Sequence, residues 1–206
     1  GARVIDAGLA ATGTRLEVAT ALAQAGISRP LAFIAMSEAS ALDAAARLGY
    51  PATLLPQQAG AAATTLLDHD TAEAVIEHRV VLGTHGEAIV LLQGGAPSGD
   101  QRGRHHVVGD AVVATEGTVA GEAAQALAID AAKALGATAI TGDVAEVDGQ
   151  LVVWDVTAVA DFRAARLTGD RTVGQALADL VAAKTPVMAG SSRVENVPVA
   201  MAHQVW

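Results

Sequence analysis

Two aspartates in the last third of the chain could together hold a hard cation. Asp143 and Asp155 lie in two apolar runs joined by Asp148-Gly149, a strong signal for a two-residue hairpin turn. On an antiparallel pair of strands the two carboxylates can face each other, and Mg²⁺ prefers such oxygen ligands. The same spacing also fits an ordinary hairpin with exposed aspartates, so both interpretations stay open.

The composition favours a folded protein with small-molecule or protein partners. Of the 206 residues 51% are hydrophobic, which is enough for one substantial core. The net charge is −9 and the basic residues are scattered, which argues against nucleic acid and an anionic membrane surface as partners. The chain has no cysteine, no long apolar run and no leader pattern, so we expect a cytoplasmic protein without disulfides.

Helix and strand signals alternate along most of the chain. Short polar side chains at Thr14, Ser37 and Asp70 can accept hydrogen bonds from the first turn of a helix, so three helices are expected to begin there. The predicted helices span 14–26, 37–48, 70–83, 119–135 and 172–183. The predicted strands are 4–5, 31–36, 52–55, 64–67, 88–92, 105–108 and 111–114, followed by the hairpin at 142–162, while 94–103 is expected to be a surface loop.

Four segments of this pattern occur in an order that is typical of one family. They are ALAQAGISRP at 21–30, LGYPATLLP at 48–56, GRHHVVGDAVVA at 103–114 and VWDVTAVADF at 153–162. With them the chain resembles the ATP-grasp family over about 1–183. The resemblance is closest to the ribosomal-protein glutamate ligases and the amino-group-carrier ligases of lysine and arginine biosynthesis.

The resemblance implies the fold and its division. We expect an α+β fold of two lobes with antiparallel sheets, forming one ATP-grasp-like domain over 1–185. The small lobe is expected over about 25–93, and an irregular tail over 186–206. Since Gly1 falls where the family's central region begins, we expect the usual N-terminal domain to be absent.

The resemblance also implies a site for Mg²⁺ and ATP. Each position of the family's site has a counterpart in this sequence, although several have changed in residue type. Asp143, Asp155 and Thr157 correspond to metal ligands, Arg15 to a lysine that contacts phosphate, Gly60 to the loop over the phosphates, and Arg104 to the catalytic arginine that stabilises the acyl phosphate.

Three departures from the family pattern weaken this site. Leu55 stands where the family has a phosphate-binding lysine, and the segment ending at Gln93 lacks the carboxylate expected beside the nucleotide. Asp155 and Thr157 replace a longer Glu and an Asn. Losing a buried charge-assisted contact costs roughly 2–5 kcal/mol, so we expect ATP and Mg²⁺ binding to be weak or lost.

Three functional hypotheses therefore stay open. The first is a degenerate ATP-grasp-like protein that serves as a non-catalytic binding or partner subunit, homo- or hetero-oligomeric, for a small-molecule or carrier-protein ligand. Its setting would be amino-acid or carrier-protein carboxylate–amine ligation. The alternative is a divergent ATP-dependent ligase with a reduced Mg·ATP site that a partner chain completes. A third is an assembly protein whose apolar tail contacts another subunit.

Other candidate residues have ordinary structural explanations. Arg104 could be a surface arginine paired with Asp100 or Asp110 instead of a catalytic group. His105 and His106 are adjacent in a predicted strand and point to opposite faces, so a solvated or hairpin-packing role is expected. By the same alternation, Trp154 should face away from Asp155 and pack in the core.

Overall fold

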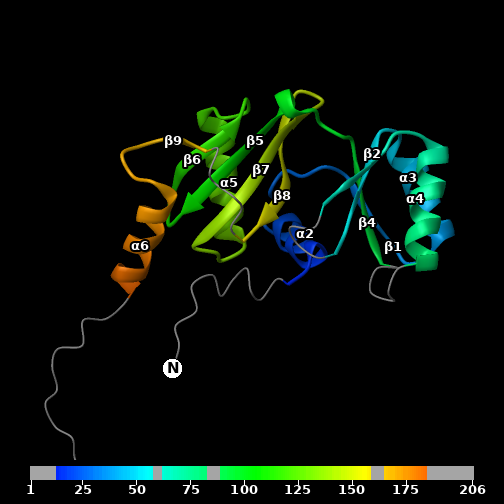
Figure 1. The fold of residues 1–206 in the computed structure, drawn as a ribbon, viewed down its shortest axis with the longest axis horizontal. Helices are drawn as coiled ribbons and strands as arrows, with labels where there is room; N and C mark the ends of the chain where they lie inside the picture. The colour runs from blue at the N-terminus through cyan, green and yellow to red at the C-terminus, as the bar shows by residue number, and fades with distance from the viewer. Residues whose placement is uncertain (1–12, 58–61, 83–88, 159–164, 185–206) are drawn as a thin grey trace, which may run out of the picture.

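Two antiparallel sheets lie side by side, each with helices packed against it (Figure 1). The computed structural model describes residues 13–57, 62–82, 89–158 and 165–184. The small sheet has the strand order β1-β4-β2-β3, and the large sheet has the order β8-β7-β5-β6-β9. The expected α+β class with two antiparallel sheets is thereby confirmed.

The small lobe consists of four strands covered on one face by two helices (Figure 1). Buried alanines of both helices meet Leu54, Leu66 and Leu92 of the sheet, so the helix backbones approach the strands closely. The elements are β1 (Ala32–Ala35), α3 (Glu38–Leu48), β2 (Ala52–Leu55), β3 (Thr64–Leu66), α4 (His69–Leu82) and β4 (Val90–Gly94).

The large lobe carries the longer strands. Its main core lies between the sheet and α5. There, Ala124, Ala128 and Ala131 contact valines of β7 and β8. Because this core covers one face of the sheet, the opposite face is available for polar residues. The elements are α2 (Arg15–Gln24), η1 (Gly99–Gln101), β5 (Arg102–Val108), β6 (Ala111–Gly117), α5 (Glu122–Ala134), β7 (Ala139–Val147), β8 (Gln150–Thr157), β9 (Arg166–Leu167) and α6 (Val173–Lys184).

The helix caps follow the sequence prediction at two of three sites. Thr14 and Ser37 both form capping boxes at the starts of α2 and α3. The prediction of Asp70 as a cap is wrong. The helix α4 already begins at His69, and Asp68 accepts a hydrogen bond from the Thr71 N–H at 2.7 Å, which leaves Asp70 within the first turn.

The hairpin that contains the two histidines is longer than predicted. Its first strand begins at Arg102, inside the segment expected to be a loop, and its second strand runs to Gly117. His105 and His106 are both fully buried, so the packing role is confirmed and the solvated one is wrong. Burial also lowers the pKa of His105, because the charged imidazolium would lose its hydration.

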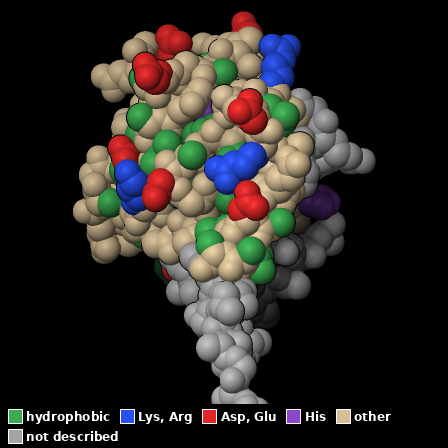
Figure 2. All heavy atoms as spheres, turned by 90° about the vertical axis from the view of Figure 1, so that its left-hand side faces the viewer, with side chains coloured by type: hydrophobic (Ala, Val, Ile, Leu, Met, Phe, Trp, Pro, Cys, Tyr) green, Lys and Arg blue, Asp and Glu red, His purple; other side chains and the backbone are tan. Residues whose placement is uncertain are grey.

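Several predicted features lie outside the described residues. They are the strand at 4–5, Gly60 and the tail over 186–206, and the domain division therefore stays a prediction. None of the helices in the described part of the chain is long and apolar enough to cross a membrane. On the face seen in Figure 2, acidic, basic and hydrophobic side chains of the described residues are interspersed.

Two glycines allow the chain to cross closely over the start of β5. A Cβ atom at Gly103 would lie 1.8 Å from the carbonyl oxygen of Val119. Gly117 has a φ of 83°, which favours glycine, and the Thr118 N–H then donates to the Arg102 carbonyl at 3.2 Å. The crossing fixes the β5 backbone next to Arg102 and Arg104.

We expect Gly103→Ala to destabilise the protein. The new methyl group would push the backbone at Val119 away, and overpacking of this kind typically costs about 1–3 kcal/mol. Urea denaturation measures the loss. The control is Gly99→Ala, since a Cβ at Gly99 meets nothing within 4 Å. Equal stability of the two variants would contradict the close crossing.

Candidate functional site

The two predicted aspartates do face each other across the hairpin. Asp143 of β7 is the direct register partner of Asp155 of β8. The turn residues Asp148 and Gly149 have φ values of 51° and 75°, as a two-residue hairpin turn of this type requires. The predicted pairing of the two aspartates is therefore confirmed, although the turn alone would place Asp143 opposite Trp154.

Each of these carboxylates is already paired with arginine. Asp155 accepts from Arg15 Nη2 at 2.6 Å. Asp143 accepts from Arg102 Nη2 and from Arg104 Nε, both at 3.0 Å. Guanidinium groups therefore stand where a bound cation would have to approach the two aspartates.

Trp154 lies on the same sheet face as the paired aspartates, so the prediction that it faces away from Asp155 is wrong. The register shifts at this point, with Asp143 opposite Asp155 but Val144 opposite Val153, which leaves Trp154 as an extra residue. Such a β-bulge breaks the alternation of side chains. Trp154 is buried, as expected, and its ring lies 5.9 Å from the Arg102 guanidinium carbon.

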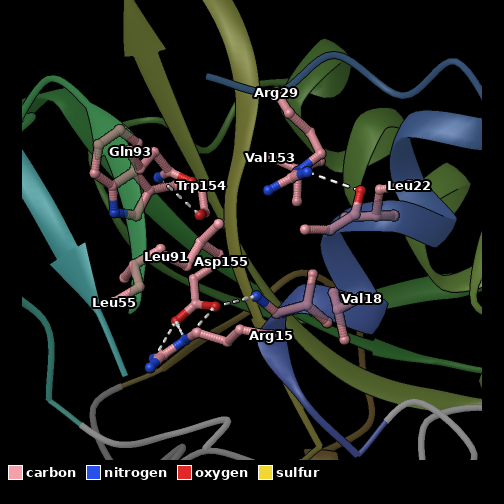
Figure 3. Close-up of a pocket in the computed structure, with 12 residues that line it drawn as sticks. Arg15, Val18, Leu22, Arg29, Leu55, Leu91, Gln93, Val153, Trp154 and Asp155 are labelled. Carbon is pink, nitrogen blue, oxygen red and sulfur yellow. Dashed lines mark hydrogen bonds and ion pairs between the residues drawn. The ribbon is translucent and has the colours of Figure 1, made fainter. Parts of the chain in front are cut away.

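Arg15 connects the two lobes at the start of α2. Its side chain is 5% exposed and reaches Asp155 on β8 (Figure 3). Its Nη1 donates to the Pro56 carbonyl, just beyond β2, at 3.0 Å. The capping box at Thr14 starts the helix directly before it, which orients this side chain. A single buried guanidinium thus joins a helix, the small lobe and the large sheet.

Around Arg15, side chains of the described residues fill the space between the lobes. Leu55 and Leu91 are buried against Ala19 of α2, and Gln93 donates to the Trp154 carbonyl at 3.2 Å (Figure 3). A small cavity that is also lined by Arg15 measures about 10 Å³. It has room for about one water molecule.

The charged residues predicted to bind Mg²⁺ and ATP are engaged with one another in this structure. Leu55 brings no charge, and Arg15 is engaged by Asp155 and Pro56. Thr157, the third predicted metal ligand, lies opposite Thr141, two residues beyond Asp155. Among the described residues, no three acidic, histidine or cysteine side chains form a group that could hold a metal ion. The metal and phosphate roles of the predicted residues stay predictions.

A second, open pocket lies beside Asp143 and measures about 240 Å³. Arg102, Arg104 and Glu116 line it together with three glycines. Arg104 Nη1 lies 3.5 Å from Glu116 Oε2, so Arg104 pairs with Glu116 and Asp143 and not with Asp100 or Asp110. Burial would lower the pKa of Arg104, but the carboxylates of Asp143, Glu116 and Asp155 together outweigh this effect and raise it.

Three charged residues of the site were missed from the sequence. Arg102 and Glu116 lie outside the bounds predicted for the hairpin. Residues two apart on a strand share a face, so a strand predicted to begin at Arg102 would have placed Arg102 and Arg104 on the same face. Arg29 lines the cavity between the lobes and donates to the Ala19 carbonyl at 2.8 Å. Burial lowers the pKa of Arg29, against an opposing effect of Asp155.

No model of a protein family and no curated protein sequence matches the chain, whereas solved structures do. An ATP-grasp protein with a RimK domain from Sphaerobacter thermophilus has a TM-score of 0.65 and 25% identity, over 85% of this chain and 67% of that one. The ATP-grasp ligase PsnB, in complex with minimal precursor, Mg and ADP, gives 0.61 and 22%, over 84% and 59%.

D-alanine–D-alanine ligase from Bacillus anthracis is similar at a TM-score of 0.57 and 13% identity, over 72% of this chain and 57% of that one. The chain therefore has the ATP-grasp fold. It spans less than two thirds of the length of PsnB and of D-alanine–D-alanine ligase.

We expect Asp155→Ala to lower the free energy of unfolding by about 3–5 kcal/mol, because it removes the carboxylate paired with the buried Arg15. Urea denaturation measures the change. In the control Asp179→Ala, the lost pair with Arg171 is exposed on both sides, and the cost should stay below about 1 kcal/mol. Similar small losses in both variants would mean that the buried pair does not hold the lobes together.

Proposed function

We propose that the chain is a degenerate ATP-grasp-like protein that acts as a non-catalytic binding or partner subunit in amino-acid or carrier-protein carboxylate–amine ligation. The observation that carries this proposal is the buried ion pair between Arg15 and Asp155 in the cleft between the lobes. The family resemblance gives these positions to phosphate and metal binding. Here the two side chains form an ion pair with each other. This pairing supports the proposal that the site no longer binds Mg·ATP.

The energetic cost of admitting a nucleotide supports the same proposal. The Arg15–Asp155 pair would have to open, and breaking a buried pair costs about 3–5 kcal/mol. Leu55 and Leu91 would also leave their contact with Ala19. Since each 1.4 kcal/mol is about a tenfold change in affinity, the pair alone weakens binding by roughly 100-fold or more.

One observation favours the alternative of a divergent ligase. Arg104 and Asp143, which the resemblance gives to catalysis and metal binding, both line a pocket that is open. A structure of PsnB, which has the same fold, holds minimal precursor, Mg and ADP. In this alternative a partner chain would complete the nucleotide half of the site.

Calorimetric titration with ATP and Mg²⁺, with and without EDTA, distinguishes the two. We expect no saturable binding at micromolar concentrations. We also expect no gain in affinity from Leu55→Lys, because this side chain is 2% exposed and packed in the closed cleft. Metal-dependent micromolar binding to the unaltered chain would overturn the proposal.

The matched control for the lysine variant is Leu55→Met, which keeps the volume and adds no charge. Circular dichroism and thermal denaturation establish that both variants are folded. A folded Leu55→Lys protein that binds ATP more tightly than Leu55→Met would favour the divergent ligase. Equal affinities in the two variants support the closed cleft.

A further inference from the structure

Exposed apolar side chains gather at one edge of the small sheet. Ile34 lies within β1, and Leu31 and Met36 flank the strand at its two ends. These side chains are 64%, 49% and 73% exposed for Leu31, Ile34 and Met36 respectively. Half of the six large hydrophobic side chains that are exposed in the described part of the chain therefore lie within one short segment.

The outer edge of β1 has none of the usual features that prevent strand pairing. β1 pairs with β4 along one side, and no described strand pairs along its other side. Its residues Ala32–Ala35 include no charged residue and no proline, and its register with β4 contains no bulge. Edge strands of natural proteins commonly carry such features against pairing with another chain. β1 is therefore suited to antiparallel pairing with a further strand.

Helix α3 presents a pair of opposite charges toward the same edge. The Arg47 guanidinium carbon lies 4.7 Å from the ring centre of Phe33 in β1, so this side of the helix faces the edge strand. Asp43, one turn earlier, pairs with Arg47 at 3.8 Å, and both side chains are more than half exposed. A two-fold axis reverses the direction of a second α3 helix, so Asp43 of each copy can face Arg47 of the other. The charges at this edge are thus complementary to their own copy.

We propose that β1 is the interface through which two copies of the chain associate. The two edge strands pair in antiparallel orientation around a two-fold axis near Ile34, and the two small sheets become one continuous sheet. The exposed side chain of Ile34 then meets Ile34 of the second copy, which removes apolar surface from water. The inference goes beyond the proposed function, since Ile34, Asp43 and Arg47 do not belong to the predicted nucleotide or metal site.

The position of α3 fits this arrangement. The helix contacts both β1 and β4, so it lies over the space between the two strands. Neighbouring strands lie about 4.8 Å apart, so the two α3 helices on the joined sheet would be two strand spacings, or roughly 10 Å, apart. Packed helices lie about 8–10 Å apart. Continuation of the sheet at β1 therefore brings the two α3 helices, with their complementary charges, into contact.

The test is sedimentation equilibrium of the full chain at micromolar concentrations, where we expect a monomer–dimer equilibrium. Ile34→Lys places two ammonium groups together at the axis and should weaken the dimer about tenfold or more. The matched control is Leu167→Lys on β9, an edge strand of the large sheet, where the side chain is 51% exposed and the dimer should persist. Circular dichroism establishes that both variants are folded. A monomeric unaltered chain, or an equal loss in both variants, would refute the inference.

Exchange of the two charges on α3 tests the two-fold arrangement separately. Asp43→Arg and Arg47→Asp should each weaken the dimer severalfold, because like charges then meet across the axis. The double variant Asp43→Arg/Arg47→Asp restores opposite charges between the copies and should associate more tightly than Arg47→Asp alone. Both of these variants lack the guanidinium over Phe33, so their difference reports the contact between the copies. A double variant that associates no better than Arg47→Asp argues against the proposal.

Discussion

The buried ion pair between Arg15 and Asp155 is the contact on which the arrangement of the two lobes depends. It joins the first turn of α2 to β8, and the same guanidinium reaches the chain just beyond β2 at Pro56. Neither charged group would be stable at this depth without its partner. The pair therefore requires the helix, the small lobe and the large sheet to come together, and Leu55 and Leu91 then close the apolar remainder of the cleft.

On the large sheet, arginine side chains likewise neutralise the carboxylates. Asp143 pairs with Arg102 and Arg104, and Arg104 continues to Glu116. In water, such contacts contribute little, but here the carboxylates are mostly buried and the strands hold the partners in register. The result is a polar sheet face whose geometry is fixed by arginine–carboxylate contacts, in the place where the family resemblance led us to expect a metal ion.

Local patterns predicted the parts of this site that depend on the backbone alone. The Asp148-Gly149 turn predicts the hairpin and sets Val147 opposite Gln150, a register that would place Asp143 opposite Trp154. The bulge shifts the partner of Asp143 to Asp155, so the pairing of the two aspartates depends on more than the turn. The start of β5 did not follow from the sequence, because it pairs with β7, a strand distant in sequence. The bulge at Trp154 lies within the hairpin of β7 and β8, where the alternation of residue types does not reveal an extra residue. A one-residue bulge is enough to reverse the expected face of a side chain.

The partners of the charged residues could not be predicted for a related reason. Several acidic residues lie near Arg104 in the sequence or in the fold. Arg104 pairs with Asp143 and Glu116, because both are its direct register partners on the neighbouring strands and share its face of the sheet. Asp100 and Asp110 are nearer in sequence but are not its register partners. This pairing decides the chemistry of the site. An aspartate that faces open solvent can bind a cation, whereas Asp143 lies between two guanidinium groups that already neutralise it. The residue types suggested the first outcome, and the register of β5 between β6 and β7 produces the second.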